Sequence, residues 1–216
     1  MTVRPNALLG ILTALVLVAG TWTAGATLAA FSDTTNNPGN SFSAASSFCA
    51  SPGTQTVTAD ADSYVDENAA GSNFGTAVAL HVQSRAGGGG RNKRSLARFP
   101  LPAAQFCVVT SATLRLNGEA AAPGRTLDVY QLASGWTETG VTWSYQPGTT
   151  GSPSSAPSAM GWVQWDVTAH VQAMYAGSNH GFLVMDRTES QNPASWQVFV
   201  SREGSVNQPE LVITLA

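Results

Sequence analysis

Short segments in which apolar residues alternate with polar ones constrain the fold of this chain more than any other feature. Five segments share this pattern: residues 78–82, 114–116, 127–129, 196–200 and 211–215. A period of two gives a strand one buried face and one solvated face. Turn-forming Gly, Pro and Asn pairs separate the segments. We therefore predict an all-β fold, an antiparallel β-sandwich of jelly-roll type with about eight or nine strands.

Other stretches refine this prediction. In residues 196–200 the shared phase of Trp196, Val198 and Val200 predicts that these three side chains face the core. Residues 182–185 (FLVM) are continuously apolar, which indicates a strand buried on both faces. Residues 167–176 are the one candidate for a short helix, and residues 151–159 (GSPSSAPSA) are interpreted as a low-complexity loop.

The N-terminus has the pattern of an export signal. Residues 5–32 carry no charge, and the apolar run covers residues 8–19. A signal-peptide core needs about 7–15 apolar residues, and a membrane-spanning helix about 20. We predict a signal peptide at 1–30, cleaved after Ala26 or Ala30, and a secreted protein with no membrane association after cleavage; an uncleaved anchor is the alternative. The Ser-, Ala- and Thr-rich stretch 31–54 is interpreted as a linker, and residues 55–216 as the folded domain.

Residues 26–44 (ATLAAFSDTTNNPGNSFSA) carry a Phe-Ser-Asp element. This stretch resembles the processing region of TasA/camelysin-type surface proteins, in which a dedicated signal peptidase cuts before the Phe. The resemblance implies a cut between Ala30 and Phe31 and a mature N-terminus at Phe31.

Cys49 and Cys107 are the two cysteines of the chain. An exported protein meets oxidising conditions, so we predict a disulfide between them; two free thiols are the alternative. Neither lies in a Cys-x-x-Cys motif, which argues against redox catalysis and zinc binding.

Seven short motifs follow one another along residues 61–203: ADSYV (61–65), NFG (73–75), LARF (96–99), ATLRL (112–116), GWTE with VTW (135–143), WDVT (165–168) and SRE (201–203). Their order and spacing resemble DNRLRE-type domains, which are related to polysaccharide-binding modules. The resemblance implies a β-sandwich on a secreted protein and polysaccharide, possibly acidic, as the partner.

Charged residues are scarce. They make up 11% of the chain, with 10 Lys and Arg against 13 Asp and Glu and a net charge of −3. Because no basic excess exists, nucleic-acid binding is not predicted. Arg98 and Arg202 share their phase with apolar residues, and a buried guanidinium needs a carboxylate partner. We predict a structural ion-pair network of these two arginines with Glu203, Asp62 and Asp166; an anion or glycan-carboxylate site is the alternative.

Acidic residues cluster early in the domain. Asp60, Asp62 and Asp66 suggest a structural calcium site, since calcium takes six to eight oxygen ligands. Tyr64 stands where an EF-hand would need another ligand, so a solvated acidic edge is the alternative.

Aromatic and basic residues provide the candidate ligand site. Trp136, Trp143 and Tyr145 lie in a turn-rich stretch, where we expect them to be exposed for stacking on sugar rings. Arg85, Arg91, Lys93 and Arg94 surround the glycine turn at 87–90 and would form a basic arm for an acidic polysaccharide. A solvated flexible hairpin is the alternative.

Catalytic motifs such as Gly-x-Ser-x-Gly and His-Glu-x-x-His are absent from the sequence. We predict no enzyme and no cofactor beyond the calcium. The favoured function is a secreted, non-catalytic module that binds cell-wall or extracellular-matrix polysaccharide. The alternatives are a structural surface or biofilm-matrix protein without a glycan ligand, and a polysaccharide lyase or hydrolase.

Overall fold

The computed structural model describes residues 48–86, 92–191 and 194–216. They belong to one compact unit. The predicted signal peptide, its cleavage site, most of the predicted linker, the 87–90 turn and Arg91 lie outside the described residues. No helix among the described residues has the length and apolar character needed to cross a membrane.

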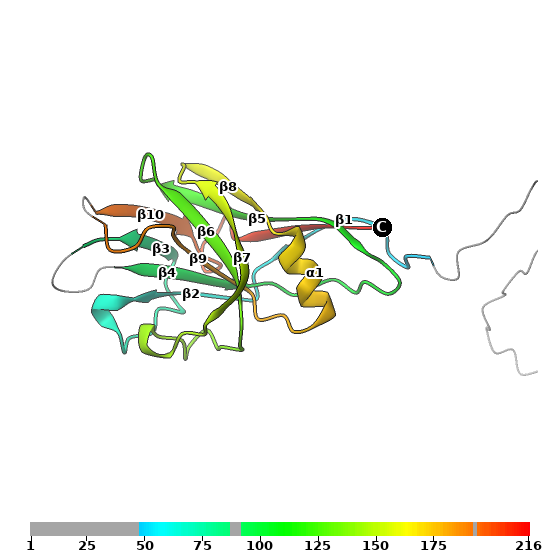
Figure 1. Cartoon of the computed structure of the whole chain (residues 1–216), viewed down its shortest axis with the longest axis horizontal. Helices are drawn as coiled ribbons and strands as arrows, with labels where there is room; N and C mark the ends of the chain where they lie inside the picture. The colour runs from blue at the N-terminus through cyan, green and yellow to red at the C-terminus, as the bar shows by residue number, and fades with distance from the viewer. Residues whose placement is uncertain (1–47, 87–91, 192–193) are drawn as a thin grey trace, which may run out of the picture. The chain divides into compact units, whose positions relative to one another are not determined.

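The described residues form eleven strands, one α-helix and two short 3-10 helices (Figure 1). In chain order these are β1 (Gly53–Thr58), β2 (Ala61–Asp66), η1 (Glu67–Ala69), β3 (Ala79–Ser84), β4 (Lys93–Arg98), β5 (Val109–Ala120), β6 (Thr126–Leu132), η2 (Trp143–Tyr145), β7 (Thr149–Pro157), β8 (Gly161–Asp166), α1 (Thr168–Ala176), β9 (Phe182–Asp186), β10 (Ser195–Val200) and β11 (Glu210–Leu215). The prediction of an all-β fold is confirmed, with eleven strands where about eight or nine were expected.

All pairings between strands are antiparallel, and they join the strands into one curled sheet. One layer of the fold contains β8, β5, β11, β1, β10 and β3, and the other contains β2, β4, β9, β6 and β7. A single residue pair, Gln83 with Lys93, connects the layers between β3 and β4. Apolar side chains from both layers, such as Leu114 and Phe199 from the first and Val129 and Phe182 from the second, form one buried cluster. The curled sheet is therefore a sandwich folded over a single main core.

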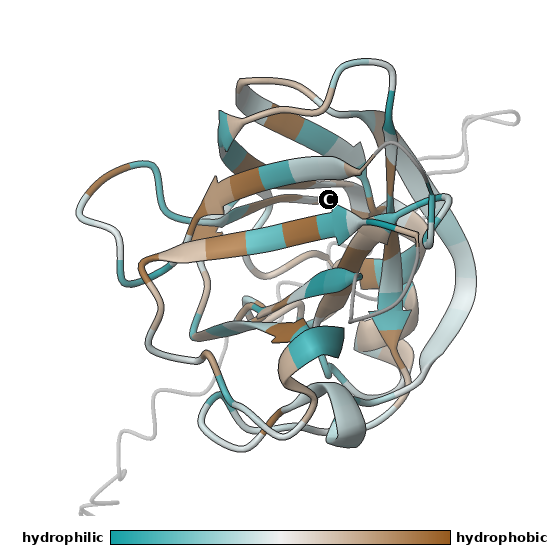
Figure 2. Cartoon of the chain, turned by 90° about the vertical axis from the view of Figure 1, so that its left-hand side faces the viewer, coloured by the Kyte–Doolittle hydropathy of each residue, from teal (hydrophilic) through white to brown (hydrophobic). Residues whose placement is uncertain are grey.

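A second apolar cluster lies on the outer face of the β2–β4–β9 layer. Leu96 of β4 and Leu183 of β9 point into it, whereas Val184 of β9 points into the main core. The connection 133–148 covers this second cluster with Trp136 and Val141. Strand β9 is thus buried on both faces, as the FLVM run predicts. The alternation of apolar and polar residues along the strands is visible in Figure 2.

Two sequence interpretations are wrong. Residues 151–159 fall largely in strand β7, which pairs only with β6 and is mostly exposed. An edge strand of this kind needs no apolar face, so its sequence lacks the expected alternation. In β10, Trp196 is 47% exposed while Phe199 is fully buried, so the phase facing the core is the opposite of the one predicted.

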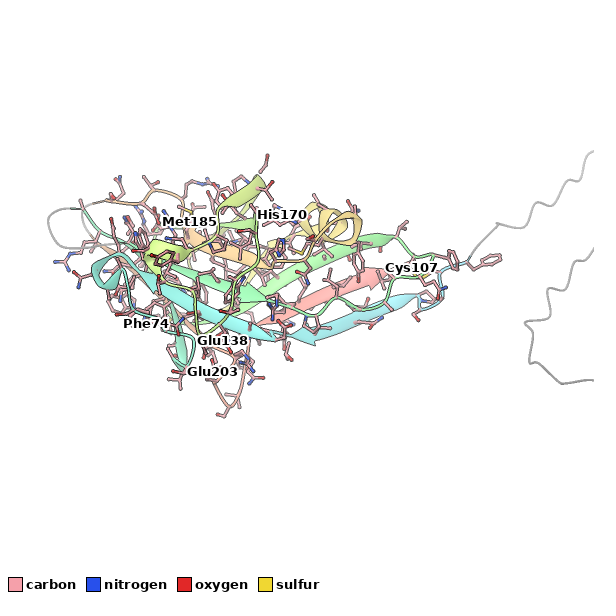
Figure 3. The ribbon with its side chains drawn as sticks, turned by 90° about the horizontal axis from the view of Figure 1, so that it is seen from below. Phe74, Cys107, Glu138, His170, Met185 and Glu203 are labelled. Carbon is pink, nitrogen blue, oxygen red and sulfur yellow. A yellow bond between two sulfur atoms is a disulfide. The ribbon has the colours of Figure 1, made fainter. Side chains whose placement is uncertain are left out.

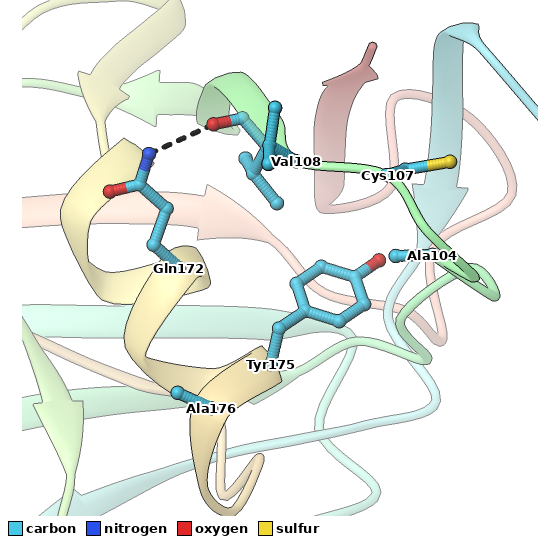
Figure 4. Close-up of a pocket in the computed structure, with 7 residues that line it drawn as sticks. Ala104, Cys107, Val108, Gln172, Tyr175 and Ala176 are labelled. Atoms are coloured by element: carbon cyan, nitrogen blue, oxygen red, sulfur yellow. Dashed lines mark hydrogen bonds between the residues drawn. The ribbon is translucent and has the colours of Figure 1, made fainter. Parts of the chain in front are cut away.

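The expected helix is confirmed as α1, which packs against β5. The expected disulfide between Cys49 and Cys107 is also present. A pocket of about 420 Å³ lies between α1 and the Cys107 loop, lined by apolar side chains together with Tyr175 and Gln172 (Figure 4). Gln172 Nε2 donates to the Val109 carbonyl at 2.8 Å, and Tyr175 Oη donates to the Pro102 carbonyl at 2.6 Å. Both polar groups are thereby used to hold the helix.

Candidate functional site

The five tryptophans in the described part of the chain fall into two groups. Trp136 and Trp165 are buried, and their indole N–H groups donate to the carbonyls of His180 and Leu127 at 2.8 and 3.1 Å. The exposure expected for Trp136 is therefore wrong, because the 133–148 connection folds back onto the sheet and buries it. Trp143, Trp162 and Trp196 are partly exposed.

Trp143 and Tyr145 bracket the turn η2 within the 133–148 connection. Thr142 caps this turn by accepting a hydrogen bond from the Tyr145 backbone N–H. The Tyr145 side chain is 81% exposed, and Trp143 packs partly against the second apolar cluster. A turn that carries one aromatic ring open to solvent and one anchored on the domain is suited to stacking.

Arg94 of β4 lies over this turn. Its guanidinium carbon is 4.6 Å from the centre of the Trp143 ring. Its Nε and one Nη donate to the Glu189 carboxylate at 2.8 and 2.7 Å, and the other Nη donates to Gln146 Oε1 at 3.1 Å. We call Trp143, Tyr145, Arg94, Glu189 and Gln146 the Trp143 surface. It unites three of the five predicted ligand residues, whereas Trp136 lies beneath it and Arg91 is outside the described residues.

The connection that carries Trp143 is held by an earlier loop. Asn73 Nδ2 donates to the carbonyls of Glu138 and Val141, both at 2.7 Å. Gly75 lies so close to the Glu138 carbonyl that a Cβ at this position would collide with it. Phe74 and Glu138 are labelled in Figure 3, which views this side of the domain. The NFG motif therefore positions the aromatic turn from a distance in sequence.

An acidic cluster surrounds Arg202. Its Nη1 donates to both Glu138 carboxylate oxygens at 2.8 Å and lies 3.3 Å from Glu203, and its backbone N–H donates to Asp62 Oδ2 at 2.7 Å. Burial, together with the neighbouring charges of Glu203 and Glu138, raises the pKa of Asp62 to about 7, against the lowering effect of the Arg202 hydrogen bond. Glu138 belongs to the GWTE motif, but it was not predicted as a partner of Arg202, because it lies in an irregular loop without periodicity.

The predicted ion-pair network is therefore only partly assembled. Arg202, Glu203 and Asp62 lie together, but Arg98 pairs with Asp60 at 2.9 Å on an exposed part of the surface. Asp166 accepts hydrogen bonds from Thr168 at the start of α1, which lowers the pKa of Asp166. Neither Arg98 nor Asp166 belongs to the Arg202 cluster.

The predicted calcium set of Asp60, Asp62 and Asp66 is wrong as a single site. Residues of a strand are about 3.3 Å apart along its axis, so β2 and the residue before it spread these carboxylates over the length of the strand. Asp66 pairs with Lys93 at 2.8 Å and caps η1, while Asp60 pairs with Arg98. The carboxylates that do converge are Asp62, Glu138 and Glu203, with oxygens within 4.8 Å of one another. Arg202 already supplies positive charge to that cluster.

Ion pairing neutralises most of the basic side chains. Within the described ranges, Lys93, Arg94, Arg98, Arg115, Arg125, Arg187 and Arg202 each contact a carboxylate. Arg85 is exposed and has no ion pair with a described residue. Of the predicted basic arm, Arg85 has no ion pair with a described residue, whereas Lys93 pairs with Asp66 and Arg94 belongs to the Trp143 surface.

The fold and the Trp143 surface together define a two-layered β domain with an aromatic platform on its outside. The chain belongs to carbohydrate-binding module family 96, whose family model matches residues 53–215. That range begins with β1 and ends with β11, so the family covers the whole sandwich. Among curated proteins, none matches the chain. The resemblance to carbohydrate-binding modules is thus confirmed at the level of the family.

Proposed function

We propose that this protein binds a neutral polysaccharide at the Trp143 surface and does not cleave it. The observation that carries the proposal is the highly exposed Tyr145 ring in the same turn as Trp143, whose ring is stacked with the Arg94 guanidinium. The apolar C–H faces of sugar rings stack on aromatic rings. A guanidinium has five N–H donors, and Arg94 uses three of them within the protein. Two donors of Arg94 and the acceptor oxygens of Glu189 are therefore left for sugar hydroxyls.

The charge of the surface favours a neutral ligand over the acidic one considered from the sequence. Glu189 balances the charge of Arg94 through two hydrogen bonds. A polyanion would have to compete with that carboxylate or lie beside it, and like charges at close range repel. An acidic ligand would depend instead on Arg85 and Arg91.

The cellular setting is part of the same proposal. The disulfide between Cys49 and Cys107 and the apolar leader both support a protein that acts outside the cytoplasm. Membership of a family of binding modules supports a role in attachment rather than in catalysis.

Affinity electrophoresis tests the proposal. The protein is run in native gels containing hydroxyethylcellulose, xylan, mannan or polygalacturonate. We expect retardation by at least one neutral polymer, and we expect Tyr145→Ala to weaken it about tenfold, by analogy with nucleobases, whose stacking on an aromatic ring contributes on the order of 1–3 kcal/mol. Val206→Ala is the matched control, because Val206 is an exposed apolar residue in a different loop. Equal retardation of Tyr145→Ala and wild type would contradict the assignment of the site.

A further inference from the structure

A second partly exposed tryptophan has the same kind of partners as Trp143. The Arg115 guanidinium carbon lies 4.5 Å from the centre of the Trp162 ring. Arg115 also pairs with Glu210, with 2.9 Å between Nη1 and Oε2. The combination of tryptophan, stacked arginine and balancing carboxylate in the Trp143 surface therefore occurs again, built from β8, β5 and β11.

Strand register fixes where this group lies. On β8 the side chains of Val163 and Trp165 enter the main core, so Trp162 and Gln164 point to the outside. On β5, Leu114 and Leu116 enter the core, which directs Arg115 outward as well. Arg115 is paired with Gln164 across the strands, and Glu210 of β11 is paired with Arg115 on its other side.

The two surfaces lie on outer faces of different layers. Arg94 shares its face of β4 with Leu96, whose side chain enters the second cluster beyond the β2–β4–β9 layer. Trp162 and Arg115 lie beyond the opposite layer, on the far side of the main core. The elements that carry them are well separated in Figure 1, where β8 and β5 lie at the top and β2 and β4 below.

Several groups around Trp162 are available to a ligand. Met160, at the turn before β8, is 66% exposed, and Gln164 is exposed. Arg115 Nε is buried and lacks a hydrogen-bond partner among the described residues, so a ligand reaches this donor only if the side chain moves. No described residue accepts a hydrogen bond from the Trp162 indole N–H. The site thus combines apolar area with the indole N–H of Trp162 and the exposed amide of Gln164.

We define the Trp162 surface by five residues: Trp162, Arg115, Glu210, Gln164 and Met160. We infer that this surface binds a second neutral polysaccharide chain and makes the domain bivalent. This inference rests on the proposed function of the Trp143 surface. The neutral character follows from the pairing of Arg115 with Glu210. A flat face of antiparallel strands suits an extended polymer, because ligand contacts recur along the strand direction. Two surfaces facing away from each other would cross-link two chains.

The experiment compares binding with cross-linking for the polymer that retards wild type most in the gels. Turbidity and sedimentation of protein–polymer mixtures report cross-linking, and affinity electrophoresis reports binding. We expect wild type to produce turbidity that passes through a maximum with protein concentration. Trp162→Ala should remain retarded, because its Trp143 surface is intact, but should lose most of the turbidity. Tyr145→Ala should also lose most of the turbidity and should keep only the weaker retardation that its remaining surface provides, and the double variant should lose retardation.

Gln164→Ala is the second variant, since this exposed residue can be changed without touching the core. It should reduce turbidity several-fold at unchanged melting temperature, and Val206→Ala should leave it unchanged. Wild-type turbidity in Trp162→Ala and Gln164→Ala would overturn the second surface and leave the Trp143 surface standing. Dimers of the polymer-free protein that Trp162→Ala dissociates would also overturn it, because the face would then be a self-interface. Failure of wild type to bind any polymer would instead remove the proposed function itself.

Discussion

The Asp62 carboxylate accepts a 2.7 Å hydrogen bond from the backbone N–H of Arg202, a residue 140 positions later in the chain. This contact ties the start of β2 to the connection between β10 and β11. Asp62 is 1% exposed and lies among two further carboxylates, Glu138 and Glu203. The stability of this junction therefore depends on proton binding.

Stability should fall as pH rises through the range in which Asp62 ionises. Its pKa is about 7 in the folded protein against an ordinary value of 3.8, so the folded state binds the proton more tightly. The contribution of proton binding at Asp62 to the free energy of unfolding is complete below about pH 4 and is lost as pH approaches 7. Its upper limit is about 4 kcal/mol. The amide of Asp62→Asn does not ionise in this range. The melting temperature of this variant should therefore rise relative to that of wild type between pH 5 and pH 8. Asp60→Asn is the control, since Asp60 is exposed. A constant difference in melting temperature between Asp62→Asn and wild type across this pH range would refute the prediction.

Arg94→Lys should weaken polymer binding at the Trp143 surface roughly three- to tenfold. Lysine cannot make the paired hydrogen bonds to Glu189 while lying flat on an indole ring. Isothermal titration calorimetry with a soluble oligosaccharide of the bound polymer measures the change. Arg98→Lys serves as control, because Arg98 contacts Asp60 and no described aromatic ring. Identical affinities of Arg94→Lys and wild type would mean that Arg94 has no part in binding.

Asn73→Ala should lower both stability and binding, although Asn73 is not part of the Trp143 surface. The substitution leaves the carbonyls of Glu138 and Val141 without their shared donor, which costs about 1–3 kcal/mol. Urea unfolding measures the first effect and gel retardation the second. Thr54→Ala removes an exposed hydrogen bond to Thr214 and should change neither by a comparable amount. Full binding by Asn73→Ala would show that the 133–148 connection keeps its shape without this anchor.

Removing the disulfide should destabilise the domain without affecting binding. The bridge joins residues 58 positions apart, and a loop of this size corresponds to about 4 kcal/mol in the chain-entropy account. The double variant Cys49→Ser with Cys107→Ser should unfold at lower guanidinium concentration and should not respond to dithiothreitol. Because the Trp143 surface is built from other segments, its retardation in gels should persist under conditions where the variant is folded. A loss of binding there would link the bridge to the site.

The fold could be predicted from the sequence because burial of one strand face leaves a local pattern. The FLVM run correctly predicted that β9 is buried on both faces, and residues 167–176 correctly predicted the helix α1. Trp196 was assigned to the wrong face since apolar residues also line the outer side of β10, where the Trp196 ring contacts His81 at 5.4 Å and Lys93 at 5.7 Å. Strand β7 was missed because hydrogen bonds to β6, rather than apolar contacts, define it.

The candidate site was less predictable. Trp143, Tyr145 and Arg94 were identified by residue type, but their proximity depends on Asn73 and Gly75, and the balancing carboxylate of Glu189 is 95 positions from Arg94. Glu138 stands in the GWTE motif, but its pairing with Arg202 could not be predicted, since a loop residue has no periodicity. Long-range pairing of this kind is set by tertiary packing, which a local pattern does not encode.

The pairing of Gly53 with Leu215 brings the first and last strands of the sandwich side by side. The polypeptide therefore enters and leaves the domain at neighbouring points. A domain with this arrangement is transplantable, because it can be spliced into a surface loop of a host protein with little displacement of the flanking backbone. Inserted in this way, the sandwich would bring the Trp143 surface and the Trp162 surface into the new protein as one folded unit.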